Sequence, residues 1–147
     1  MDVNRPSDGH DPWVDIGPHR FADFDKHCEW VPHGTVELAH AEQLVSRLLS
    51  HQARVGHIAL IVDGRELTPI GADVRGFYVK SMSQVLTRMP IAVFGASLLS
   101  RVAQTLAMRA GQLVHRIDVD LRHVDTRQEA VAYIQQRLAV HPRENLS

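Results

Sequence analysis

Three arginines, an aspartate and a serine occupy positions from which they could together hold a small anion. Asp63 directly follows an apolar run typical of a buried strand, and open α/β sheets bind ligands at the carboxyl ends of such strands. Ser97 precedes a helical pattern, and the unpaired N–H groups of a helix N-terminus attract anions. The basic residues that could lie around the same edge are Arg65, Arg75 and Arg101. Together these residues predict a site for a small anion or a phosphorylated peptide.

A simpler interpretation of the same residues involves no ligand. Asp63 would cap the turn after its strand, and Ser97 would cap the N-terminus of its helix. The arginines would then be solvated or would form ion pairs with neighbouring acids. Both interpretations stay open, because residue types and spacing do not separate them.

The sequence contains no motif typical of a catalytic centre. Ser97 stands in the first half of a G-x-S-x-G nucleophile elbow, but Leu99 occupies the position of the second glycine. No glycine-rich nucleotide-binding motif is present. Cys28 and His27 are adjacent on an expected strand, so their side chains should point to opposite faces and form no reactive pair. We predict that the chain is not an enzyme.

Histidine is abundant, but its positions do not indicate a metal site. The chain has 10 histidines and 1 cysteine. The histidines are dispersed, with no His-Glu-x-x-His motif and no other recognised ligand spacing. A single cysteine excludes an internal disulfide framework and a thiolate-rich zinc site. The sequence therefore predicts no metal ion and no other cofactor.

The composition is that of an ordinary globular domain. The 147 residues fall within the usual span of one domain. The formal net charge of -1 gives no reason to expect a nucleic acid or another strongly charged partner. No run of about 18 apolar residues is present, and the first residues lack the apolar core of a signal peptide. We therefore expect a cytoplasmic protein without membrane contact.

Hydrophobic periodicity predicts a single α/β domain over residues 13–140, between a flexible N-terminal tail at 1–12 and a C-terminal tail at 141–147. Short strands precede an alternation of helices and buried strands. This order is typical of a layered fold with a mixed sheet, parallel core strands, right-handed crossovers and about four helices. The expected strands cover 14–16, 20–24, 29–31, 57–62, 91–95 and 113–124, and the expected helices cover 39–52, 71–89, 98–110 and the segment after Thr126.

Two of the expected helices should pack an apolar side on the sheet. In the helix at 39–52 this side includes Leu44, whereas His51 falls on the polar side. The helix at 71–89 should end at Pro90, because proline has no N–H to donate and its ring clashes with the preceding turn.

The last two elements of the alternation have the clearest patterns. The helix at 98–110 should end at Gly111 as its C-cap. The strand at 113–124 alternates apolar and charged residues, which places it near a sheet edge. That edge could pair with a second copy of the chain to form a homodimer, or its charges could instead prevent such pairing. The residues of the helix that should face inward are Leu99, Val102, Ala103, Leu106 and Ala107.

Three segments resemble the STAS domains (sulfate transporter and anti-sigma factor antagonist) and the SpoIIAA-like proteins of bacteria. The run IALIVDGR at 58–65 resembles the central strand of STAS-like domains, and PIAVFGAS at 90–97 resembles the next strand and turn. The run VDTRQEAVAYI at 124–134 is similar to the closing segment of SpoIIAA-like proteins. The resemblance covers residues 27–139 and implies a STAS-like α/β fold with a regulatory role.

The resemblance also shows where this sequence departs from the regulatory antagonists. Those domains carry a serine or threonine that accepts a phosphate at the start of the helix after the central strand. Ala72 or Asp73 occupies this position, and neither residue can accept a phosphate in that switch. Thr68 is the nearest hydroxyl, but it precedes Pro69 and the helix. The chain is therefore more similar to the stand-alone SpoIIAA-like proteins.

Two functions follow as hypotheses. The first is a non-enzymatic STAS-like domain that binds a protein partner or a small anionic ligand in a regulatory role. The alternative is a carrier of a small molecule or lipid, which requires a cavity between the helices and the sheet. Phe77, Val85, Leu99 and Leu106 would line that cavity.

Overall fold

The computed structural model describes residues 11–115 and 119–140 of the chain. Within these residues three strands precede an alternation of four α-helices with three further strands, as the sequence predicts, and one short 3-10 helix, η1, follows the second α-helix. In chain order the elements are β1 (Trp13–Ile16), β2 (His19–Asp23), β3 (Cys28–Val31), α1 (Leu38–Val55), β4 (Leu60–Asp63), α2 (Ala72–Ser81), η1 (Met82–Gln84), β5 (Met89–Phe94), α3 (Leu98–His115), β6 (Val119–Val124) and α4 (Arg127–Val140).

The six strands form one mixed sheet in the order β1-β2-β3-β4-β5-β6. β1 pairs antiparallel with β2, and β2 with β3, whereas the pairs from β3 to β6 are parallel. This topology confirms the predicted α/β class with parallel core strands. β6 lies at a sheet edge, as its alternating sequence predicts.

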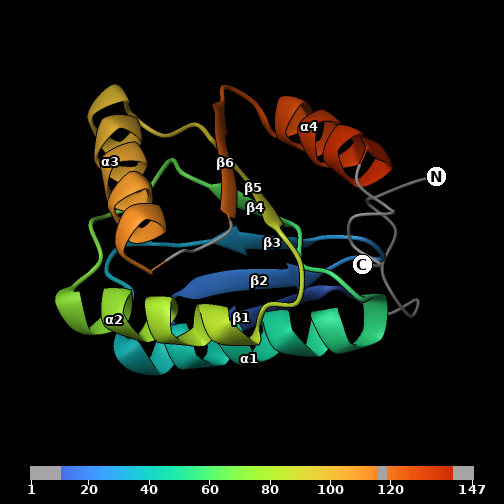
Figure 1. Cartoon of the computed structure of the whole chain (residues 1–147), viewed down its shortest axis with the longest axis horizontal. Coiled ribbons are helices and arrows are strands. Elements are labelled where there is room, and N and C mark those ends of the chain that lie inside the picture. The colour runs from blue at the N-terminus through green and yellow to red at the C-terminus, as the bar shows by residue number, and fades with distance from the viewer. Residues whose placement is uncertain (1–10, 116–118, 141–147) are drawn as a thin grey trace.

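Two apolar layers hold the sheet between the helices. α1 and α2 cover one face, and α4 covers the other (Figure 1). Successive residues of β4 divide between the layers: Leu60 packs with side chains of α1 and α2, and Ile61 packs with α4. Every residue of β4 is buried, as predicted for a central strand. Burial of each large apolar side chain contributes ~1.5–3 kcal/mol to the free energy of unfolding.

The helix predicted over 71–89 is much shorter in the structure. α2 ends at Ser81, η1 follows, and β5 begins at Met89. Pro90 is therefore the second residue of a strand, and the prediction that it stops a helix is wrong.

A buried side chain of α1 explains this early helix end. The Nε2 group of Gln52 donates to the Gln84 carbonyl at 2.9 Å, and its Oε1 accepts the N–H of Leu86 at 2.9 Å. These two bonds hold the segment after η1 in an extended form, so a tertiary contact overrides the local helical pattern.

The end of α3 is also predicted wrongly. α3 continues past Gly111 to His115, and β6 begins at Val119 instead of at residue 113. A glycine inside a helix costs about 1 kcal/mol relative to alanine, which weakens the helix but does not by itself end it. The central residues of the predicted alternation, 116–118, lie outside the described part of the chain.

No helix among the described residues is both long enough and apolar enough to cross a membrane. The predicted tails fall mainly on residues 1–10 and 141–147, which lie outside the described ranges.

Candidate functional site

The carboxyl ends of β4, β5 and β6 lie side by side at one end of the strands, which we call the carboxyl edge. Most of the predicted site residues lie there. The N–H of Gly64, after β4, donates to the Phe94 carbonyl at 2.7 Å, and the N–H of Gly95, after β5, donates to the Val124 carbonyl at 3.3 Å. A Cβ on Gly64 would lie 2.9 Å from the Cβ of Ala96, so a side chain there would force the two loops apart. The fold thus brings Asp63, Arg65, Ser97 and Arg101 to one region.

Asp63 and Arg65 use each other as partners. Asp63 is buried. The Nε group of Arg65 donates to Asp63 Oδ1 at 2.9 Å and to Oδ2 at 3.2 Å, and its Nη2 group donates to Oδ2 at 2.5 Å. Burial alone would raise the pKa of the Asp63 carboxyl, but the hydrogen bonds and charge of Arg65 outweigh burial and lower it. The guanidinium is therefore already paired. The backbone N–H of Arg65 also donates to Asp63 Oδ1 at 3.1 Å, which matches the interpretation of Asp63 as a turn cap.

Arg101 is likewise engaged within the fold. Its Nε group donates to the Ala96 carbonyl at 3.1 Å, and its Nη2 group donates to the Val124 carbonyl at 3.1 Å and to Asp125 Oδ1 at 3.0 Å. The Ser97 Oγ accepts the N–H of Ser100 at 3.1 Å, which confirms the predicted N-cap of α3. These bonds tie the start of α3 to the end of β6.

The remaining two predicted residues do not complete an anion site. Arg75 is exposed on α2. The Thr68 Oγ1 is enclosed and has no hydrogen-bond partner, so this hydroxyl is not accessible to a modifying enzyme. Of the predicted set, only Arg75 presents a guanidinium that is not drawn into the contacts described above.

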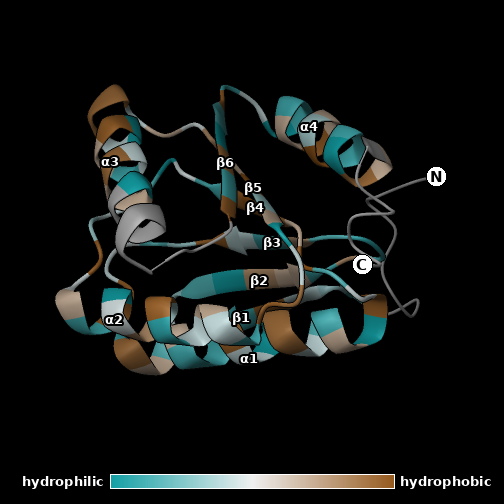
Figure 2. Ribbon diagram, in the orientation of Figure 1, coloured by the Kyte–Doolittle hydropathy of each residue, from teal (hydrophilic) through white to brown (hydrophobic). Residues whose placement is uncertain are grey.

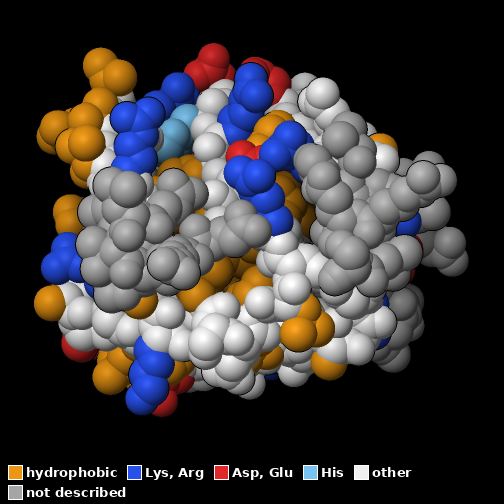
Figure 3. Space-filling view, viewed as in Figure 1, with side chains coloured by type: hydrophobic (Ala, Val, Ile, Leu, Met, Phe, Trp, Pro, Cys, Tyr) orange, Lys and Arg blue, Asp and Glu red, His pale blue; other side chains and the backbone are white. Residues whose placement is uncertain are grey.

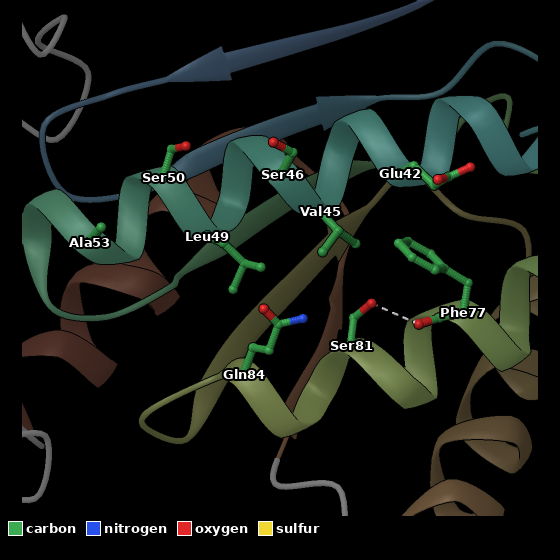
Figure 4. A pocket seen from close by; sticks show the side chains of 9 residues that line it. All are labelled: Glu42, Val45, Ser46, Leu49, Ser50, Ala53, Phe77, Ser81 and Gln84. Atoms are coloured by element: carbon green, nitrogen blue, oxygen red, sulfur yellow. Dashed lines mark hydrogen bonds between the residues drawn. The ribbon is translucent and has the colours of Figure 1, made fainter.

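The cavity expected for a carrier is not formed by the predicted residues. Leu99 and Leu106 are exposed instead of lining an interior space. A shallow groove of about 520 Å³ lies between α1 and α2, and of the four predicted lining residues only Phe77 borders it (Figure 4). Serine, glutamine and glutamate side chains form much of the groove: Glu42, Val45, Ser46, Leu49, Ser50, Ala53, Phe77, Ser81 and Gln84 line it.

α3 presents its apolar side to solvent, which is the reverse of the prediction. We call this surface the outer face of α3. Leu98 is 78%, Leu99 81%, Val102 49% and Leu106 62% exposed. The hydropathy colouring marks hydrophobic residues along this helix (Figure 2), and the space-filling view shows hydrophobic side chains gathered at the upper left (Figure 3). The outer face consists of Leu98, Leu99, Val102, Ala103, Leu106 and Ala107, all exposed.

Polar contacts with β6 explain why α3 is turned this way. The Oε1 of Gln104 bonds to His123 Nε2 at 2.9 Å, and the Nε2 of Gln104 donates to Ser100 Oγ at 2.8 Å. Burial and the charge of Arg101 lower the pKa of His123, which disfavours the protonated imidazole. The polar side of α3 thus faces polar groups of the edge strand, and the leucines lie on the outside.

A polar cluster at the other end of the strands, where β2 ends and β3 begins, was not predicted. Asp23 at the end of β2, Cys28 at the start of β3 and His51 of α1 place one donor atom each within 4.8 Å of one another. His51 is fully buried, although the sequence places it on the polar side of its helix. The signal in the sequence is its spacing of three from Leu48 and seven from Leu44, both on the buried side.

Comparison of the chain with protein-family models, with curated proteins and with solved structures finds no match. The functional assignment therefore depends on the site itself.

Proposed function

We propose that this chain is a non-enzymatic, STAS-like regulatory domain that binds a protein partner through the outer face of α3. The exposure of this face carries the proposal. Leu99 and Leu106 are 81% and 62% exposed, although burial of a leucine contributes ~1.5–3 kcal/mol. A contiguous apolar patch on a protein surface typically marks an interaction site.

The chemistry of the outer face favours an amphipathic helix of another protein as its occupant. The six side chains of the outer face are apolar, and the exposed Arg109 borders them three positions after Leu106, so most of the partner surface that they bury has to be apolar. Ala103 and Ala107 lie beside the leucines, and small residues next to large ones form the grooves in which helix ridges pack. The apolar stripe of a second helix would bury both surfaces.

The contacts of the arginines at the carboxyl edge count against a small anionic ligand as the partner. Arg65 is paired with Asp63, and Arg101 donates to two carbonyls and to Asp125. An anion would have to displace these acceptors. The carrier alternative has less support, because the groove between α1 and α2 is open to solvent and only one of the four predicted lining residues borders it.

The test compares the wild-type chain with a Leu99→Glu/Leu106→Glu variant and with Leu86→Glu as matched control. Leu86 is 75% exposed but lies in the segment before β5, outside α3. Proteins captured by the wild-type chain from bacterial lysate are purified, and their affinities are measured by isothermal titration. We expect a partner whose affinity falls at least about 100-fold in the double variant, since two buried leucines are lost, and stays unchanged in Leu86→Glu.

Three outcomes would overturn the proposal. A partner that binds all three proteins equally would place the binding surface elsewhere. Binding of the wild-type chain to phosphatidylcholine vesicles, lost in the double variant, would assign the outer face to a lipid surface. Self-association in sedimentation without any other partner would assign it to a second copy of the chain.

A further inference from the structure

The polar cluster of β2, β3 and α1 combines three different metal-binding side chains on rigid elements. Asp23 and Cys28 are direct partners in the antiparallel register of β2 and β3. His51 approaches them from α1, with its Nδ1 atom 2.6 Å from Asp23 Oδ1. Cys28 and His51 are fully buried, so their positions are set by packing.

A thiolate, an imidazole and a carboxylate are ligands that Zn²⁺ takes in proteins. We propose that Asp23, Cys28 and His51 form a binding site for one zinc ion, with a water molecule as fourth ligand. The three donor atoms lie within 4.8 Å of one another. Tetrahedral zinc with bonds of 2.0–2.3 Å holds its ligands about 3.3–3.7 Å apart. The Asp23–His51 pair, at 2.6 Å, therefore has to open by up to about 1 Å, and a pair as far apart as 4.8 Å would have to close by about as much. Small changes in side-chain torsion can supply both movements.

Arg54 occupies the place of the cation in the metal-free protein. Its Nη2 group lies 2.7 Å from Asp23 Oδ1 and 3.1 Å from His51 Nδ1. The Arg54 side chain is 41% exposed and belongs to the last turn of α1, so it can turn outward into water. Asp23 is 33% exposed on the same side, which gives an ion a path to the buried donors.

The charges of the two states balance. In the metal-free state the Asp23 carboxylate is paired with Arg54, and Cys28 is a free thiol that is fully buried. On binding, the Cys28 thiol gives its proton to water and its sulfur bonds to Zn²⁺, while the guanidinium leaves. The two positive charges of Zn²⁺ are then balanced by one thiolate and one carboxylate, so the net charge of the cluster is zero in both states.

Cobalt substitution tests the site in the full-length protein. Titration with Co²⁺ should give one equivalent of bound metal, with a near-ultraviolet thiolate-to-metal charge-transfer band and the visible bands of tetrahedral cobalt; added Zn²⁺ should remove them. Cys28→Ser should lose the charge-transfer band.

Arg54→Gln keeps the test decisive even if changes at the buried ligands impair folding. Removal of the competing cation should tighten Zn²⁺ binding at least about tenfold. Arg47→Gln, an exposed arginine of the same helix, is the matched control and should leave the affinity unchanged. The absence of stoichiometric binding would overturn the proposal, as would a cobalt spectrum without a thiolate band or equal affinities of Arg54→Gln and wild type.

Discussion

Arg127 at the start of α4 donates through Nε to Glu29 Oε1 of β3 at 2.8 Å, and the two residues are 98 positions apart in the chain. Glu29 is buried, and His27 Nε2 lies 3.1 Å from its second carboxylate oxygen. The carboxylate therefore joins the first helix turn of α4 to the middle of the sheet. The local sequence around either residue does not predict this contact, yet the contact fixes the position of α4 on the sheet.

Replacement of Glu29 by alanine should lower the free energy of unfolding by about 1–3 kcal/mol, because buried donors lose their acceptor. Urea unfolding followed by circular dichroism measures the change. Glu42→Ala is the control, since Glu42 is exposed on α1 and should change stability by less than about 0.5 kcal/mol. Equal effects of the two substitutions would contradict a structural role of the Glu29 contact.

The same carboxylate predicts how stability depends on pH. Burial alone would raise the pKa of Glu29, but hydrogen bonds from His27 and Arg127 lower it below the usual value of 4.5. A carboxyl whose pKa is lower in the folded than in the unfolded state binds its proton more weakly when folded. The stabilisation it gives is complete above pH 4.5 and is lost as the pH falls through the folded-state value.

Urea unfolding at a series of pH values below neutrality should therefore show a loss of stability that begins near pH 4.5. In Glu29→Gln this loss should be smaller, because the titrating group is gone while the side-chain volume is retained. Asp23 and Asp63 have lowered pKa values as well, so part of the loss should remain in the variant. Parallel pH profiles of wild type and variant would rule out Glu29 as a contributor.

Gln52 should be required for the extended segment between η1 and β5. Gln52→Leu keeps a good helix former in α1 but leaves the Gln84 carbonyl and the Leu86 N–H without their partner, which should cost about 1–3 kcal/mol. Gln43→Leu, at an exposed site of α1, controls for the added hydrophobic surface. Unfolding by urea compares them, and a loss no larger than in the control would show that the segment holds its form without Gln52.

The order of strands and helices could be predicted because each core element carries its own periodicity. β4 is an example: its apolar run indicates burial on both faces, and the fold requires nothing else of it. The end of α2 could not be predicted, since the helical pattern of 71–89 is overridden by Gln52, which lies in another helix. A window of local sequence does not contain that partner.

The orientation of α3 is a second feature that the local sequence does not predict. Its periodicity correctly predicts an amphipathic helix, and by default such a helix turns its apolar stripe to the core. In the structure the polar side of α3 faces the sheet instead, where Gln104 bonds to His123 of β6. Among the candidate site residues, the sequence correctly places Asp63 and Ser97 at the carboxyl edge. It does not show that the guanidinium groups of Arg65 and Arg101 are hydrogen-bonded within the fold. Some of their acceptors are backbone carbonyls, which every residue carries and no residue type identifies.

The attachment of α3 should depend on Arg101. With its leucines outside, α3 is joined to the sheet edge largely by polar contacts, and Arg101 supplies three of them, to Ala96, Val124 and Asp125. Arg101→Ala should therefore loosen α3 while the apolar core under α1, α2 and α4 remains intact. Hydrogen–deuterium exchange measures this by segment: amides of 101–108 should exchange at least about tenfold faster, corresponding to about 1.4 kcal/mol of local stability. Amides of β4 and β5 should exchange as in wild type, because their protection depends on global unfolding.

Arg75→Ala, at an exposed position of α2, is the control and should leave both segments unchanged. Unaltered exchange of α3 in Arg101→Ala would mean that contacts other than these three hold the helix in place.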